Sequence, residues 1–303
     1  MSPHDPNPDS IPGSPPPRHH RVDVDGMALA VDVRGSGRSV LIIGAADEDR
    51  EFFRGVAERL ASTHTVVTYD RRGTAVAGVE GWPCDARRHA TDAATILEAL
   101  DLSEVAVLGV SAGGIVALRL AIDHPERLRV VMLHEPGVLS MTESGRVLRD
   151  RGDRAVADHL ADHPGDWAGA AQALMGSATT GEASVAAVQR DDDWFRRRAA
   201  TNARAFILGD LPMTHEPVDT DEVDSCAVDL RFSYGSASMA VFAEIVTALA
   251  TLRAVDPIEL HGVGHGVHAD PDATVRYVRR MTRPTDPTTV TDHSVPAEPP
   301  DGQ

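Results

Sequence analysis

Short apolar runs alternate along the chain with stretches whose apolar residues recur every three or four positions. The first pattern is typical of buried parallel strands and the second of amphipathic helices. The predicted strands are 39–44, 64–70, 104–109, 128–135, 227–235 and 257–264, and the predicted helices are 48–61, 85–101, 111–125, 239–252 and 271–281. Together with a hairpin over 21–35, this alternation predicts an α/β fold: a mostly parallel, eight-stranded sheet with helices on both faces.

The alternation is interrupted once, and the two ends of the chain lack it altogether. Between about 136 and 225 there are helix-like pieces but no clear strand, which predicts a helical cap over 137–225. The core then comprises 20–136 and 226–282. Residues 1–19 and 283–303 are rich in proline and polar residues, so both are expected to be disordered tails.

Charge and cysteine content narrow the range of partners. The formal net charge is −17, which disfavours binding to nucleic acid or to anionic membranes. The 29 basic residues are all arginine, so lysine-based covalent catalysis is excluded. Two cysteines form no disulfide framework, and no apolar run has the length of a membrane span. A cytoplasmic protein is the expectation, because the N-terminus lacks the apolar region of a signal peptide.

One motif carries catalytic chemistry. Gly109-Val110-Ser111-Ala112-Gly113 follows a predicted strand and opens a predicted helix, the setting of a nucleophile elbow. The sharp turn would expose the Ser111 hydroxyl. The Ala112 N–H, at the start of the helix, would then face an oxyanion formed at the attacked carbonyl.

Three histidines, His261, His265 and His268, lie close together near the end of the chain. A metal site would need them to converge on one ion, and the intervening glycines disfavour the helix that would achieve this. His265 lies in a glycine-flanked loop beyond the last strand, where a serine hydrolase carries its base. We therefore predict His265 as the base, no metal, and ordinary loop roles for His261 and His268.

The third catalytic group should be a carboxylate that orients the imidazole. The loop after strand 227–235 has none. Asp229 precedes the apolar part of that strand and Asp256 precedes the next strand, so both are expected at the opposite end of the sheet. Glu135 ends the predicted strand 128–135, immediately after "LRVVMLH", at the catalytic end of the sheet. We therefore predict Glu135 as the acid.

A second oxyanion donor is expected in the small-residue loop after strand 39–44. The N–H of Ala45 is the first choice, and Gly44 and Ala46 remain alternatives.

With these residues in place, the region 20–282 resembles the α/β-hydrolase superfamily, including a "YDRRG" segment within Val66–Gly73. The elbow region, "YGSAS" and "HGVGHGVHADPD" are similar to the zearalenone lactonases, in which the acid is the glutamate of an "HE" pair, here His134-Glu135. That resemblance implies a macrolactone substrate under a helical cap and a pocket tryptophan, for which Trp194 is the candidate. The cap and the Ile43-Gly44 pair depart from the family pattern.

The predicted function is a cofactor-independent serine hydrolase that acts on a small-molecule ester or lactone. Two alternatives remain open: an acyltransferase or cyclase of natural-product metabolism, and a non-catalytic ligand-binding member of the fold. The oligomeric state, including a homodimer, also stays open.

Overall fold

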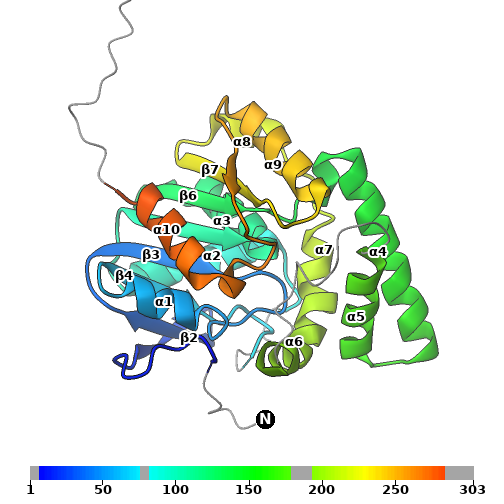
Figure 1. Ribbon diagram of the computed structural model, residues 1–303, viewed down its shortest axis with the longest axis horizontal. Helices are drawn as coiled ribbons and strands as arrows, with labels where there is room; N and C mark the ends of the chain where they lie inside the picture. The colour runs from blue at the N-terminus through cyan, green and yellow to red at the C-terminus, as the bar shows by residue number, and fades with distance from the viewer. Residues whose placement is uncertain (1–6, 76–81, 179–192, 284–303) are drawn as a thin grey trace, which may run out of the picture.

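The computed structural model describes residues 7–75, 82–178 and 193–283 (Figure 1). Its centre is one eight-stranded sheet in the order β1-β2-β4-β3-β5-β6-β7-β8. The strands are β1 Arg18–Val24, β2 Met27–Arg34, β3 Arg38–Ile43, β4 His64–Tyr69, β5 Val105–Val110, β6 Leu128–His134, β7 Asp229–Gly235 and β8 Ile258–Leu260. Strand β2 runs opposite to the other seven strands, which share one direction, so the predicted mostly parallel sheet is confirmed.

Alternating side chains of the central strands face two separate apolar cores. In β3, Val40 and Ile42 pack on one side with α1 (Arg54–Leu60) and α10 (Pro271–Met281). Leu41 and Ile43 face the other side, which is covered by α2 (Ala86–Ala99), α3 (Ala112–Asp123) and α9 (Ala240–Leu252). Strands buried on both faces read as continuous apolar runs, and this explains the pattern in the sequence.

The region between β6 and β7 is helical, as predicted. The cap consists of α4 (Glu143–Asp162), α5 (Trp167–Ala178), α6 (Asp193–Ala205), a π-helical turn over Phe206–Asp210 and α7 (Leu211–Met213). Figure 1 shows these helices gathered at one side of the sheet. The short α8 (Thr220–Ser225) packs instead against α3 and α9 of the core, so the cap ends before the predicted limit of 225.

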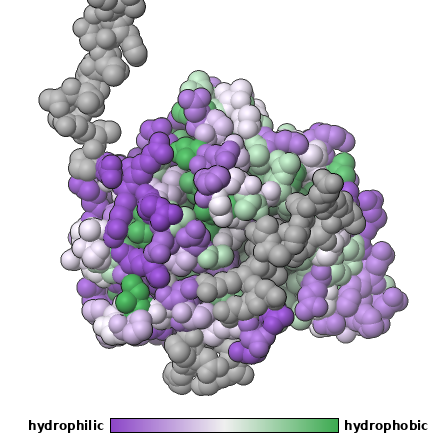
Figure 2. Space-filling view, in the orientation of Figure 1, coloured by the Kyte–Doolittle hydropathy of each residue, from purple (hydrophilic) through white to green (hydrophobic). Residues whose placement is uncertain are grey.

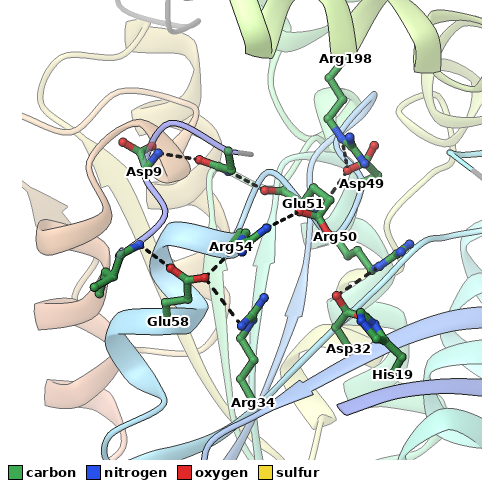
Figure 3. Close-up of polar contacts among 12 residues, drawn as sticks. Asp9, His19, Asp32, Arg34, Asp49, Arg50, Glu51, Arg54, Glu58 and Arg198 are labelled. Atoms are coloured by element: carbon green, nitrogen blue, oxygen red, sulfur yellow. Dashed lines mark hydrogen bonds and ion pairs between the residues drawn. The ribbon is translucent and has the colours of Figure 1, made fainter. Parts of the chain in front are cut away.

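Among the described residues there are also three single turns of 3-10 helix: Pro125–Arg127, Leu139–Met141 and Val267–Ala269. Helix α1 begins at Arg54, whereas the sequence predicted a helix from residue 48. The intervening residues form a turn that contacts the cap: Arg198 of α6 contacts Asp49 at 2.6 Å (Figure 3).

The predicted N-terminal tail differs from what the structure shows. Strand β1 begins at Arg18, and the segment before it is bound to the core (Figure 3). The Asn7 side chain donates to the Glu51 carbonyl at 2.6 Å, and the Ile11 N–H donates to Glu58 at 2.6 Å. The expectation of disorder is therefore wrong for residues 7–19, because specific hydrogen bonds fix a segment that composition alone marks as unable to fold. The predicted C-terminal tail lies, from residue 284 on, outside the described residues.

The visible surface is mainly hydrophilic (Figure 2). Among the described residues, the large apolar side chains that are exposed are Ile11 and Val147. In that part of the chain no helix is long and apolar enough to span a membrane.

Candidate active site

Ser111 occupies a sharp turn between β5 and α3. Its φ of 51° and ψ of −117° are unusual for a residue with a side chain, as expected of a nucleophile elbow. A side chain on Gly109 would collide with α3, and one on Gly113 would collide with the Ile43 and Gly44 carbonyl oxygens. The two motif glycines therefore let α3 pack directly against the ends of β3 and β5, which brings the loop after β3 close to Ser111.

Glu135 follows β6 and also has a positive φ, 44°. Its side chain is buried, and Oε1 accepts a hydrogen bond from the Gly235 N–H at 2.8 Å. Oε2 accepts one from the Ser238 hydroxyl at 2.7 Å and lies 2.6 Å from His265 Nδ1. Burial alone would raise the pKa of Glu135, but the hydrogen bond and charge of His265 outweigh it, so the pKa lies below its ordinary value.

His265 is thereby oriented by the predicted acid. A carboxylate can only accept, so His265 carries its proton on Nδ1, and Nε2 is left for another partner. The ring of Phe242 stacks on the imidazole at a centroid distance of 4.2 Å and fixes its plane. His265 and Ser111 line the same cavity. The structure therefore brings together, in one place, the three residues proposed from the sequence.

That cavity lies between the core and the cap. Its other lining residues are mostly apolar and come from both parts, with Phe52, Leu139, Leu174, Phe195, Phe206 and Phe242 among them. Trp194, the predicted pocket tryptophan, is not among the described lining residues. It is buried behind them, with its ring 4.8 Å from that of Phe195, which faces the cavity instead.

The loop after β3 does not leave the predicted second oxyanion donor, the Ala45 N–H, free. The Ala45 N–H, the first choice from the sequence, already donates to Glu48 Oε2 at 2.7 Å. Ala45 and Ala46, one of the alternatives, both line the cavity with Ser111 and Ala112, but the Ala45 N–H is engaged by a carboxylate.

A comparison with protein-family models identifies the family to which this chain belongs. Residues 38–211, more than half of the chain, match the family model described as the alpha/beta hydrolase fold. The chain belongs to the α/β-hydrolase fold family. The matched region runs from the start of β3 to the start of α7 and includes Ser111 and Glu135.

Curated relatives of this α/β hydrolase match over part of their length. The uncharacterized hydrolase YraK of Bacillus subtilis (strain 168) is 36% identical over 124 residues, 40% of this chain and 45% of that protein. The putative carbamate hydrolase RutD of Azorhizobium caulinodans is 33% identical over 113 residues, 37% of this chain and 42% of that protein. The chain thus spans less than half the length of each.

Solved structures match this α/β hydrolase over most of its length at low identity, and they show the fold alone. An alpha/beta hydrolase from Sphaerobacter thermophilus has a TM-score of 0.69 and 22% identity, over 87% of this chain and 99% of that one. Est816, described as an N-acyl homoserine lactone degrading enzyme, has a TM-score of 0.67 and 17% identity, over 86% and 99%.

Sequence reasoning missed one buried histidine of the α/β hydrolase site, His134. Its Nδ1 lies 3.2 Å from the Ser233 hydroxyl, and its Nε2 lies 3.2 Å from the Gly264 carbonyl, next to His265. Burial lowers the pKa of His134 to about 4, so the ring is neutral at pH 7 and can accept at one nitrogen while donating at the other. His134 therefore anchors the loop that carries the candidate base. Its place beside Glu135 in the "HE" pair was the available signal.

The other two histidines predicted near His265 lie in different environments. His261 is exposed just beyond β8. His268 is buried, stacks on Phe195 at 5.1 Å, and lies 2.7 Å from Glu48. In the part of the chain that the structure describes, no group of three or more histidine, cysteine, aspartate or glutamate residues could hold a metal ion.

The pairing of Glu48 with His268 had no signal in the sequence. Burial would raise the pKa of Glu48, but His268, the Ala45 N–H and the charge of His265 together lower it. An ionised carboxylate therefore lies at the edge of the cavity, near the candidate base.

Proposed function

We propose that this α/β hydrolase cleaves a carboxylic ester or lactone through a covalent acyl-enzyme, without a cofactor. The observation that carries the proposal is the 2.6 Å contact between Glu135 and the Nδ1 atom of His265, in a cavity that Ser111 also lines. A serine hydroxyl needs a base to become a nucleophile, and a base held by a carboxylate supplies it.

The proposed reaction has two halves. Ser111 Oγ attacks the carbonyl carbon while His265 Nε2 takes the hydroxyl proton, and Glu135 stabilises the imidazolium. The oxyanion accepts a hydrogen bond from the Ala112 N–H and one from the loop after β3. When the tetrahedral intermediate collapses, His265 returns the proton to the departing alkoxide. Water, deprotonated by His265, then releases the acid and regenerates Ser111, so one water is consumed for each ester cleaved.

The substrate class follows from the cavity. Its walls are largely apolar, and polar side chains, among them Glu48, Arg149 and Arg196, are a minority of the lining. We therefore propose an ester or lactone that is mainly apolar. A zearalenone-type macrolactone, suggested by the sequence resemblance, and a lactone such as that cleaved by Est816 both fit this description.

The decisive test is covalent labelling of Ser111. A fluorophosphonate probe should label the wild-type protein but neither the Ser111→Ala variant nor acid-denatured wild type, and mass spectrometry should place the adduct on Ser111. A panel of aryl esters, lactones and zearalenone, assayed with and without alcohol acceptors, would then separate hydrolysis from acyl transfer. A folded wild-type protein that neither reacts with the probe nor turns over any of the panel would refute the proposal.

A further inference from the structure

The loop after β3 is held by two side chains of opposite charge. Glu48 accepts from the Ala45 N–H at 2.7 Å, and Arg71 Nη2 donates to the Ala45 carbonyl at 2.8 Å. Both atoms of Ala45 that could interact with a ligand through hydrogen bonds are therefore already engaged. In the same loop, the Ala46 N–H has no hydrogen-bond partner among the described residues.

The sheet order determines where that free N–H points. Strand β3 lies between β4 and β5, so Arg71, which follows β4, and Ser111, which follows β5, are on opposite sides of the loop. The Ala45 carbonyl and the Ala46 N–H belong to one trans peptide, and in a trans peptide these groups point in opposite directions. Arg71 donates a hydrogen bond to the Ala45 carbonyl from the β4 side of the loop. The Ala46 N–H therefore faces the β5 side, where Ser111 lies.

Arg71 is itself fixed by the cap. Its guanidinium is buried and contacts both oxygens of Asp210, with Nη1 to Oδ1 at 2.5 Å and Nη2 to Oδ2 at 3.3 Å. Burial would lower the pKa of Arg71, but Asp210 more than compensates and raises it, so the guanidinium stays charged. Asp210 closes the π-helical turn whose first residue, Phe206, lines the cavity. One guanidinium thus joins the cap to the peptide beside Ser111.

We propose that Arg71 is a positioning residue that aims the Ala46 N–H, rather than that of Ala45, at the oxyanion formed over Ser111, and that Asp210 makes this alignment depend on the docked cap. The inference rests on the proposed serine-hydrolase function. Arg71 does not touch the substrate; it acts through the peptide that it holds.

Arg72 provides a matched control. It is the next residue, is equally buried, and pairs with a buried carboxylate, Asp92, at 2.5 Å. Its backbone contact is with the Val24 carbonyl, away from the cavity. Arg71→Met and Arg72→Met therefore remove the same group from comparable environments, and only the first frees the Ala45–Ala46 peptide.

The experiment compares kcat and KM on a p-nitrophenyl ester, together with inhibition by a trifluoromethyl ketone, whose serine adduct carries an oxyanion. Arg71→Met should lower kcat by about 10²-fold, which is the usual effect of losing one oxyanion donor. The variant should also weaken inhibition by the trifluoromethyl ketone by a similar factor. KM should change little. Arg72→Met, measured per folded molecule, should keep kcat within about threefold of wild type. Should Arg71→Met fail to fold, Asp210→Asn keeps the side-chain volume, weakens the anchor, and should lower kcat by about 10-fold.

A further variant separates Ala46 from Ala45. Glu48→Ala frees the Ala45 N–H, so a rise in kcat would identify Ala45 as the donor and overturn the inference, whereas an unchanged or lower kcat supports Ala46. Equal effects of Arg71→Met and Arg72→Met on kcat and on the ketone, or an effect of Arg71→Met on KM alone, would also overturn it. A wild-type protein that the fluorophosphonate does not label would instead refute the proposed function itself.

Discussion

At the scale of single residues, the candidate site depends on buried groups that keep defined protonation states. Glu135 is buried but ionised, because three hydrogen bonds compensate for lost solvation. His134 is buried and neutral, because the cost of burying its charge outweighs the favourable effects of the Glu135 carboxylate and the Gly264 carbonyl. A carboxylate and a neutral imidazole in adjacent positions thus hold His265 through its ring and through its loop.

Glu135→Gln should leave the fold intact and remove most of the activity. The amide keeps the shape of the side chain but cannot stabilise an imidazolium, so kcat should fall by about 10²- to 10⁴-fold with KM less affected. Steady-state kinetics on an aryl ester would measure this, with far-UV circular dichroism as the check on folding. Activity within threefold of wild type would show that Glu135 is not the acid.

His134 should make stability depend on pH. Its pKa is about 4 in the folded protein and 6.5 ordinarily, so below pH 6.5 the unfolded chain binds a proton that the folded chain does not. The free energy of unfolding should therefore fall as pH drops from 6.5 to 4, by up to about 1.4 kcal/mol for each pH unit. Urea titrations of wild type and His134→Gln would show a shallower slope in the variant. Parallel slopes would contradict this account.

At the scale of elements, the elbow depends on close contact between α3 and the end of β3. Gly113 has no room for a side chain, because a Cβ there would meet the Ile43 and Gly44 carbonyl oxygens. The same contact sets the distance from Ser111 to the loop after β3. The packing of α3 and the geometry of the candidate site therefore both require glycine at position 113.

Gly113→Ala should accordingly destabilise the protein by about 1–3 kcal/mol and lower kcat, because α3 must move away from β3. Gly152→Ala is the control: it lies in helix α4, and a Cβ there would meet the Leu174 side chain at an ordinary van der Waals distance of 3.4 Å. That variant should be neutral or more stable by about 0.5–1 kcal/mol, as alanine is the better helix former. Thermal unfolding of both would test the contrast, and a stable, fully active Gly113→Ala would refute it.

Most of the helices and strands could be predicted from the sequence. Strands buried on both faces leave continuous apolar runs, and strand ends then place Ser111, Glu135 and His265 at one edge of the sheet. The partner of Ala45 could not be predicted, because it depends on how the turn between β3 and α1 folds back. Trp194 was misplaced for a similar reason: residues on one cap helix differ in which face meets the cavity, and the neighbouring Phe195 is the one that lines it.

At the scale of the whole molecule, polar contacts join parts of the chain that are distant in sequence. The cap is tied to the core through Arg198 and Asp49 at 2.6 Å and through Arg71 and Asp210. In α1, Glu58 pairs with Arg54 at 2.9 Å and accepts a hydrogen bond from the Ile11 N–H (Figure 3). The N-terminal segment is thus part of the folded unit.

Removing residues 1–13 should therefore lower the free energy of unfolding by about 1–3 kcal/mol, since the hydrogen bonds of Asn7 and Ile11 are lost and Glu58 is left short of a donor. Removal of residues 1–6 alone serves as the reference. Chemical denaturation would compare the two shortened proteins with the full chain. Equal stability of all three would show that the segment contributes nothing.

The twisted backbone at Ser111 has a consequence for how such a protein evolves. A non-glycine residue held at a φ of 51° and a ψ of −117° costs on the order of 1–3 kcal/mol, which glycine would largely avoid. The Ser111→Gly variant should therefore have a higher melting temperature than both the wild-type protein and the Ser111→Ala variant. Selection for thermal stability alone would favour glycine at this position, so a serine held in this strained conformation is what the proposed role as nucleophile predicts.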